Sequence, residues 1–179
     1  GCIVKHRWTA ALLALALVLA LPFSAAAETF STEDFTMEIP EGTYVFTPTT
    51  STEDPNWAMA GVANPESELS TLAEMNGVAE LVTEDGETTI LVQQQESDQT
   101  QAYFNLRYLT EEQQADFLDA IMQSQTDEIT VDKYYLDVDG QPFYRIRIDG
   151  TYQETGYHEL IYGTIVNGFT LAFNIYGGE

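Results

Sequence analysis

The sequence predicts an α+β fold, in which a mostly antiparallel β-sheet is covered by two helices. Short segments of alternating apolar and polar residues fill much of the second half of the chain. Asn-Gly and Asp-Gly pairs separate several of these segments, as is typical of tight hairpins. Only two segments, one after Asn64 and one after Thr110, combine a capping residue with apolar residues at helical spacing.

The first 27 residues have the organisation of a secretory signal peptide. A basic region at residues 5–7 precedes an apolar run at residues 8–21. Ala25 and Ala27 then satisfy the small-residue rule of signal peptidase, which predicts cleavage before Glu28. The alternative is an uncleaved membrane anchor, but the run of about 14 apolar residues is shorter than the roughly 20 that a spanning helix needs.

Residues 28–179 have the length of one ordinary domain. This part contains all 29 Asp and Glu residues and only four Lys and Arg residues, so its net charge is −25. Such a charge excludes nucleic-acid binding, which depends on Lys and Arg, and disfavours anionic lipid surfaces. The domain has no cysteine, so its core must be stable without disulfides.

The domain is predicted to open with a strand, a turn and a second strand. Phe35, Met37 and Ile39 alternate with polar residues, which indicates a half-buried strand. A turn at residues 40–42 leads to the second strand at residues 44–46.

A loop at residues 47–64, which contains Trp57, is predicted to lead into the first helix. Asn64 is expected to cap this helix, and Pro65 suits its first turn because a missing N–H costs nothing there. Asn76-Gly77 is expected to end it.

The middle of the chain is predicted to contain a hairpin and a polar loop. Residues 78–82 and 88–92 resemble two strands joined at Asp85-Gly86. Residues 93–101 are polar and predicted to be a loop, whereas residues 103–108 alternate like a strand.

The second helix has the clearest start signal, because Thr110 and Gln113 have the spacing of a capping box. Its apolar stripe is formed by Phe117, Leu118, Ile121 and Met122.

Four strands are predicted to complete the sheet, at about residues 132–138, 142–149, 157–166 and 169–176. Asp139-Gly140 and Asn167-Gly168 are predicted to be tight turns. A two-residue turn at Asn167-Gly168 would pair Val166 with Phe169 and place one set of apolar residues on the core face. This set is Leu160, Tyr162, Val166, Phe169, Leu171, Phe173 and Ile175.

Several short motifs accompany this order of elements: Phe35-Thr-Met-Glu-Ile-Pro-Glu-Gly42, Tyr44-Val-Phe46, Glu84-Asp-Gly-Glu87, Asp139-Gly-Gln-Pro-Phe-Tyr144 and Val166-Asn-Gly-Phe169. Over most of residues 33–178 the chain thereby resembles the PsbP-like domain, named for a photosystem II extrinsic subunit, and within it exported versions from Gram-positive bacteria. The resemblance implies a sheet covered by helices and used for binding rather than catalysis. Because the family usually continues with a further helix and strand, and sometimes a membrane anchor, we expect the chain to be truncated after Glu179.

Catalytic chemistry has little support in the sequence. His158 is the only histidine after residue 27, so a serine triad would have to use it. It lies on a predicted strand, and the hairpin register turns it toward the covered face, which favours a structural role over general-base catalysis. We therefore predict no catalytic residue and no cofactor, although the many acidic residues leave paired carboxylates as a formal alternative.

Metal binding is also predicted to be absent. Zinc sites need several His or Cys ligands, which one histidine cannot supply. Asp137-Val-Asp139-Gly140 is similar to the start of a calcium loop, but its twelfth position is Ile148 where the loop needs Glu. A turn is therefore favoured, with only weak and diffuse binding of divalent cations at acidic surfaces.

Three residues are candidates for partner binding. Arg145 and Arg147 alternate on one predicted strand, so their side chains point to the same face. The alternative is that both pair with nearby acids. Trp57 is either an exposed anchor for a partner or a side chain that packs its loop onto the domain.

These observations predict an exported, non-enzymatic binding or adaptor domain that acts in the bacterial cell envelope or the extracellular space. The expected partner is an envelope protein or a wall component. Contact with a membrane is expected only through an uncleaved N-terminus or a missing C-terminal anchor. The alternative is a secreted carbohydrate-binding or carbohydrate-cleaving protein, which coplanar exposed aromatic rings around a groove would favour.

Overall fold

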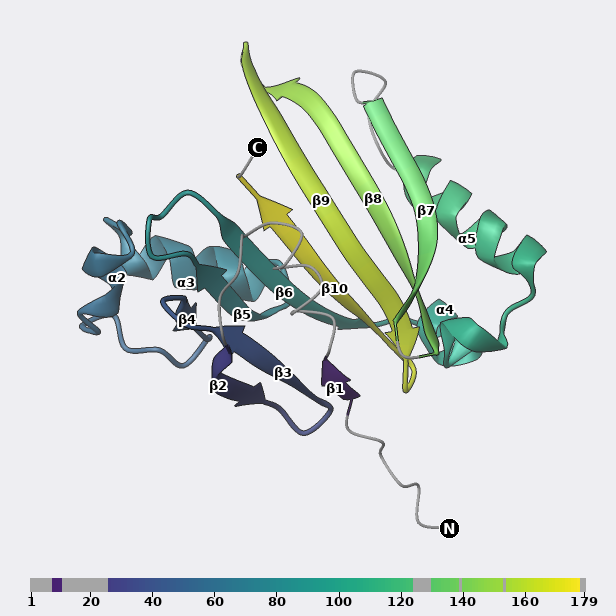
Figure 1. The fold of residues 1–179 in the computed structure, drawn as a ribbon, viewed down its shortest axis with the longest axis horizontal. Helices are drawn as coiled ribbons and strands as arrows, with labels where there is room; N and C mark the ends of the chain where they lie inside the picture. The colour runs from purple at the N-terminus through teal and green to yellow at the C-terminus, as the bar shows by residue number, and fades with distance from the viewer. Residues whose placement is uncertain (1–7, 11–25, 124–129, 139, 153, 178–179) are drawn as a thin grey trace.

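The computed structural model describes residues 8–10, 26–123, 130–138, 140–152 and 154–177. Seven strands form one antiparallel sheet in the order β4-β5-β6-β10-β9-β8-β7 (Figure 1). These strands are β4 (Tyr44–Phe46), β5 (Gly77–Val82), β6 (Thr89–Glu96), β7 (Thr130–Val138), β8 (Gln141–Tyr152), β9 (Thr155–Val166) and β10 (Phe169–Tyr176).

A smaller sheet lies against one face of the large one. It has the order β1-β3-β2, with β1 (Trp8–Ala10), β2 (Ala26–Ser31) and β3 (Phe35–Pro40). The inward side chains of β3, Phe35, Met37 and Ile39, are at most 1% exposed. They join apolar residues of β5, β6, β9 and β10 in the main core. The alternation predicted for this strand is therefore confirmed.

Helices cover the other face of the large sheet. They are α2 (Asn56–Met59), α3 (Pro65–Glu74), α4 (Asp98–Tyr103), the 3-10 helix η1 (Leu106–Tyr108) and α5 (Glu111–Gln123). One cluster packs α2 and α3 on β4 and β5, and another packs η1 and α5 on β8 and β9. The α+β class is confirmed, but in the described part of the chain more than the two predicted helices cover the sheet, and a second sheet covers its other face.

The predicted helix starts are confirmed by their side-chain bonds. Asn64 Oδ1 accepts the Ser67 N–H at 3.1 Å at the start of α3. At the start of α5, Thr110 N–H donates to Gln113 Oε1 at 2.9 Å, and Gln113 N–H donates to Thr110 Oγ1 at 3.2 Å. These reciprocal bonds form a capping box.

The predicted register of the last hairpin is also confirmed. Val166 pairs with Phe169, and Asn167 and Gly168 both have positive φ, as the turn requires. The predicted core face of the hairpin joins the main cluster, with Leu160 at its partly exposed margin.

The middle of the chain differs from the prediction. Residues 93–101 are not a loop, because β6 continues to Glu96 and α4 begins after Ser97. Ser97 and Thr100 form a capping box in which Thr100 takes the place of the usual Glu or Gln. Residues 103–108 are not a strand, since Asn105 Oδ1 accepts the Arg107 N–H at 3.0 Å and starts η1.

Most of the predicted signal peptide, at residues 1–7 and 11–25, lies outside the described residues. Of its described residues, Trp8–Ala10 form β1, which pairs in parallel with β3. The predicted cleavage point before Glu28 lies in β2. Cleavage there would remove β1 but leave Glu28–Ser31 paired with β3. No helix in the described part of the chain is long and apolar enough to cross a membrane.

Candidate binding face

Trp57 lies within α2, inside the segment predicted to be a loop, and its side chain is only 2% exposed. Its ring stacks on Phe46 at a centroid distance of 3.8 Å, and Nε1 donates to the Ser51 carbonyl at 2.8 Å. These contacts fold residues 51–57 onto β4, which is the packing alternative. A buried indole offers no surface to a partner, so Trp57 is not part of the candidate face.

Arg145 and Arg147 lie on the same face of β8, as the two-residue period of a strand predicts. Arg145 is half-buried and stands opposite Tyr162 of β9, which is 1% exposed. Arg147 is one step further out, opposite Leu160, and half of its side chain is exposed. This face therefore becomes more exposed along β8 from Arg145 to Arg147.

Asp149 and His158 extend the same face outward. Asp149 is the next residue of β8 on this face, and it stands directly opposite His158 of β9. Oδ2 of its carboxylate accepts a hydrogen bond from Arg147 Nε at 2.9 Å. Oδ1 lies 2.5 Å from His158 Nδ1. We call Arg145, Arg147, Asp149 and His158 the charged stripe.

The position predicted for His158 was wrong in one respect. The register places it on the same face as Tyr162, as expected, but 63% of its side chain is exposed. His158 is exposed because the small sheet covers only part of this face of the large sheet. In Figure 1, β2 and β3 lie beside β5 and β6, low in the view, whereas β8 and β9 rise beyond them.

The charges of the stripe hold its one acid in the ionised form. The hydrogen bond with His158 is the largest cause that lowers the pKa of Asp149, and the hydrogen bond and charge of Arg147 lower it further. Asp149 thus holds the side chains of both Arg147 and His158. The stripe contains half of the four Lys and Arg residues found after residue 27.

This arrangement suits binding of an anionic group. A guanidinium presents several donors in a plane, Nε of Arg147 donates to Asp149, and half of the Arg147 side chain is exposed. Among the described residues, no group of three or more His, Cys, Asp or Glu is arranged to hold a metal ion. Asp139 lies outside the described residues, while Asp137 Oδ1 accepts the Gly140 N–H at 2.9 Å, as in a turn.

Sequence reasoning found the two arginines but missed Asp149. Strands β8 and β9 end their pairing at Tyr152 and Thr155, and the sequence between these residues has no Asn-Gly or Asp-Gly pair. Without that register, residues 149 and 158 could not be placed opposite one another. The local signal was the Arg-x-Arg-x-Asp spacing at residues 145–149, which puts all three side chains on one face.

No family model matches the sequence, and no curated protein matches it. Among solved structures, it is similar to the solution structure of cyanobacterial PsbP (CyanoP) from Synechocystis sp. PCC 6803. The TM-score is 0.45 at 12% sequence identity, over 88% of this chain and 84% of that chain. The α+β assignment rests on this chain's own strand order and helices.

Proposed function

We propose that the chain is an exported, non-enzymatic binding domain of the bacterial cell envelope or extracellular space. In this proposal the charged stripe contacts an anionic group of an envelope protein or a wall component. The observation that carries it is the exposed Arg147–Asp149–His158 array, which lies on an uncovered part of a sheet face. The chain has a net charge of −23, which repels anions in general. Arg145 and Arg147, placed together on one strand, give an anionic ligand a favourable binding position.

Export is supported by the basic, apolar and small-residue regions of the first 27 residues. Mass spectrometry of the exported protein should find Glu28 at the N-terminus. A mature protein that retains the segment from Lys5 to Leu21 would contradict cleavage and favour an anchor.

The binding role is supported by the way the stripe is built. His158 and Asp149 stand opposite one another on two neighbouring strands, and Asp149 shares its carboxylate between His158 and Arg147. A proton-transfer base would need a substrate held within hydrogen-bond reach of His158. Recognition of a surface by charged side chains needs only accessible groups, and His158 is largely exposed while Asp149 is partly exposed.

The decisive experiment compares two double variants of the full chain. Arg145→Glu with Arg147→Glu reverses both charges, whereas Arg145→Lys with Arg147→Lys keeps them and changes only the guanidinium geometry. Each protein is immobilised and exposed to a native envelope extract. We expect the wild type to retain a partner, the Lys variant to retain part of it, and the Glu variant to lose it.

Thermal unfolding of the same proteins separates binding from folding. Because Arg145 is half-buried, the single variant Arg147→Glu is measured as well; at its exposed position it should remain folded, with the loss confined to partner capture. Equal capture by the wild type and the Glu variant would show that the stripe is not the interface.

A further inference from the structure

Phe104 has a backbone conformation that residues other than glycine rarely adopt, and its ring is nevertheless exposed. Its φ is 60° and its ψ is −47°. Across it, the Asn105 N–H donates to the Tyr103 carbonyl at 2.6 Å, which makes a γ-turn of the rare positive-φ kind. Such turns are strained, and strain of this kind persists only where the surroundings enforce it.

The surroundings of Phe104 do enforce the turn. Its N–H donates to the Thr100 carbonyl at 2.8 Å, and its own carbonyl accepts the Gly168 N–H at 2.9 Å. Next to it, the buried side chain of Asn105 accepts Gln141 Nε2 at 3.0 Å. The chain therefore fixes this backbone from α4, from the β9–β10 turn and from β8.

Burial of the ring does not account for the strain. The Phe104 side chain lies beside the β9–β10 turn, where a β-carbon on Gly168 would meet its Cδ2 at 3.6 Å, yet 44% of the residue remains exposed. A glycine would adopt the same turn without the steric cost. The structure thus holds an aromatic ring outward at a position where the backbone favours no side chain.

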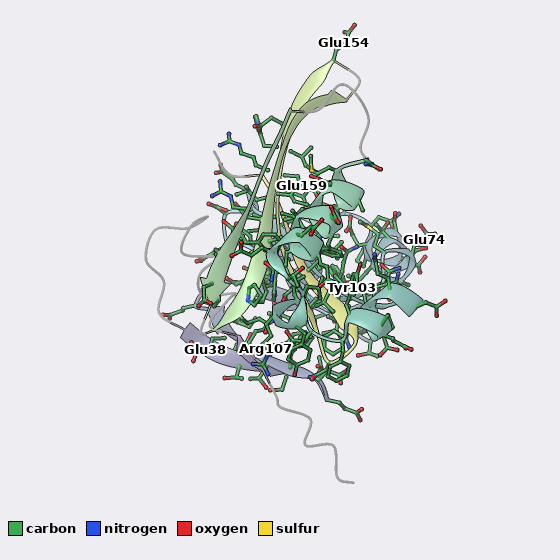
Figure 2. All side chains as sticks on the ribbon, turned by 90° about the vertical axis from the view of Figure 1, so that its right-hand side faces the viewer. Glu38, Glu74, Tyr103, Arg107, Glu154 and Glu159 are labelled. Carbon is green, nitrogen blue, oxygen red and sulfur yellow. The ribbon has the colours of Figure 1, made fainter. Side chains whose placement is uncertain are left out.

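Two further exposed side chains follow Phe104 within four residues of the chain. Tyr108 is 62% exposed, and the Arg107 guanidinium lies 5.3 Å from the centre of its ring. We call Phe104, Arg107 and Tyr108 the aromatic tip. Aromatic residues and Arg are the types that dominate the energetic centres of protein interfaces. In Figure 2, Arg107 lies at the end of the molecule opposite Glu154, the residue at the β8–β9 turn.

The charges around the tip indicate what it binds. The segment at residues 96–112 contains four acidic residues and one cation, Arg107, so its net charge is −3. All four acidic side chains are exposed. The acids are Glu96, Asp98, Glu111 and Glu112. Exposed aromatic rings in a segment whose charge is mainly acidic complement an apolar side chain flanked by Lys or Arg.

We propose that the aromatic tip docks a segment of a protein partner in which an apolar anchor is flanked by basic residues. This surface is separate from the charged stripe in position and in chemistry. His158 and Val166 are at opposite ends of β9, eight residues apart and so separated by roughly 26 Å, at about 3.3 Å per residue. The stripe offers cations to an anionic group, whereas the tip offers aromatic rings and acids to a cationic segment.

The test uses a random peptide library displayed on phage and selected on the full-length protein. The selected peptides are then synthesised and their affinities measured by fluorescence anisotropy. We expect the peptides to contain an aromatic or aliphatic residue next to Lys or Arg. Phe104→Gly and Tyr108→Ala should each weaken them roughly tenfold or more, as for residues at the centre of an interface. Met59→Ala, which removes an apolar side chain that is 63% exposed in α2, should leave the affinities unchanged.

Thermal unfolding of the Phe104 variants supplies the second readout. Phe104→Gly removes the ring and relieves the positive φ, so it should lose peptide binding while its Tm stays equal or rises. Phe104→Ala should lose binding as well but have a lower Tm than the Gly variant, because it keeps the unfavourable φ.

Four results would overturn the proposal. The first is a large fall in Tm for Phe104→Gly, which would give the ring a packing role. The second is that the selected peptides bind Phe104→Gly as tightly as they bind the wild type. The third is that the selection returns no peptide that binds at the aromatic tip, and the fourth is that the selected peptides are rich in Asp or Glu. A panel of neutral oligosaccharides is tested in parallel, and binding that Phe104→Gly abolishes would replace the peptide with a sugar.

Discussion

Every second residue of β9 lies on the same face of the sheet, yet the two ends of the strand are in different environments. At the inner end, Tyr162 and Val166 are each 1% exposed in the main core. At the outer end, His158 is on the same face, but 63% of its side chain is exposed. Alternation along a strand therefore identifies which side chains share a face, whereas the exposure of each depends on what covers that part of the sheet.

A similar contrast between covered and open parts of the large sheet separates two acids, Glu80 and Asp149. Glu80 of β5 is 9% exposed, and burial, followed by the charge of Glu68 and a hydrogen bond with it, raises the pKa of Glu80 to about 7. Asp149 of the charged stripe is partly exposed, and its hydrogen bond with His158 lowers its pKa. Burial beneath α3 thus favours the protonated form of Glu80, while the hydrogen bonds of Asp149 with exposed neighbours favour its ionised form.

The largest expected effect on stability comes from weakening the packing of the small sheet on the large one. Phe35 of β3 is fully buried between the two sheets, so Phe35→Ala should lower the free energy of unfolding by about 3–5 kcal/mol. Glu38→Ala, on the exposed side of the same strand, should change it by no more than about 0.5 kcal/mol. Urea unfolding measures both. A small effect of Phe35→Ala would mean that the small sheet does not close the core.

The second effect concerns Glu80. Its raised pKa means that the folded state keeps a proton which the unfolded state releases near pH 4.5. Stability from Glu80 is therefore present below about pH 4.5 and is lost as the pH rises to about 7. Glu80→Gln should remove this dependence, which is on the order of 3 kcal/mol. The measurement is the difference in unfolding free energy between variant and wild type at pH 4.5 and pH 7.5, with the exposed Glu38→Gln as control. A difference that does not change with pH would contradict a protonated Glu80.

The sequence predicted those parts of the fold that local interactions specify. Asn64 and Thr110 cap helices through bonds to residues three positions away, and Asn167-Gly168 sets a register between adjacent strands. All of these signals lie within a few residues of the structure they specify. The positive φ of Phe104, in contrast, is held by partners from α4 and from the β9–β10 turn, and a non-glycine residue gives no sign of it.

The candidate site was predictable in part for the same reason. The shared face of Arg145 and Arg147 follows from strand periodicity alone. The pairing of Asp149 with His158 depends on a turn without a sequence signature, and the exposure of His158 depends on where β2 and β3 end. The burial of Trp57 depends on Phe46, a residue eleven positions away on another element.

His158→Ala is expected to have a small effect on stability. A buried histidine would contribute something like 1–2 kcal/mol, but this side chain is largely exposed, so the change should stay within about 0.5 kcal/mol. Thermal and urea unfolding of the variant test this. A larger loss would place His158 in a packed environment and would remove the contrast between the two ends of β9.

The smallest expected effect is on the ionisation of Asp149, and it tests the charged stripe directly. Because the folded-state pKa of Asp149 is lowered, its contribution to stability is present above the unfolded pKa and is lost as the pH falls through the folded value. The hydrogen bond with His158 is the largest cause, so His158→Ala should raise the pKa of Asp149 toward its ordinary value. Arg147→Gln should raise it less, since the bond from Arg147 is a weaker cause. Carboxyl carbon chemical shifts recorded by NMR against pH measure each value, and an Asp149 pKa unchanged by His158→Ala would show that the two side chains do not pair in solution.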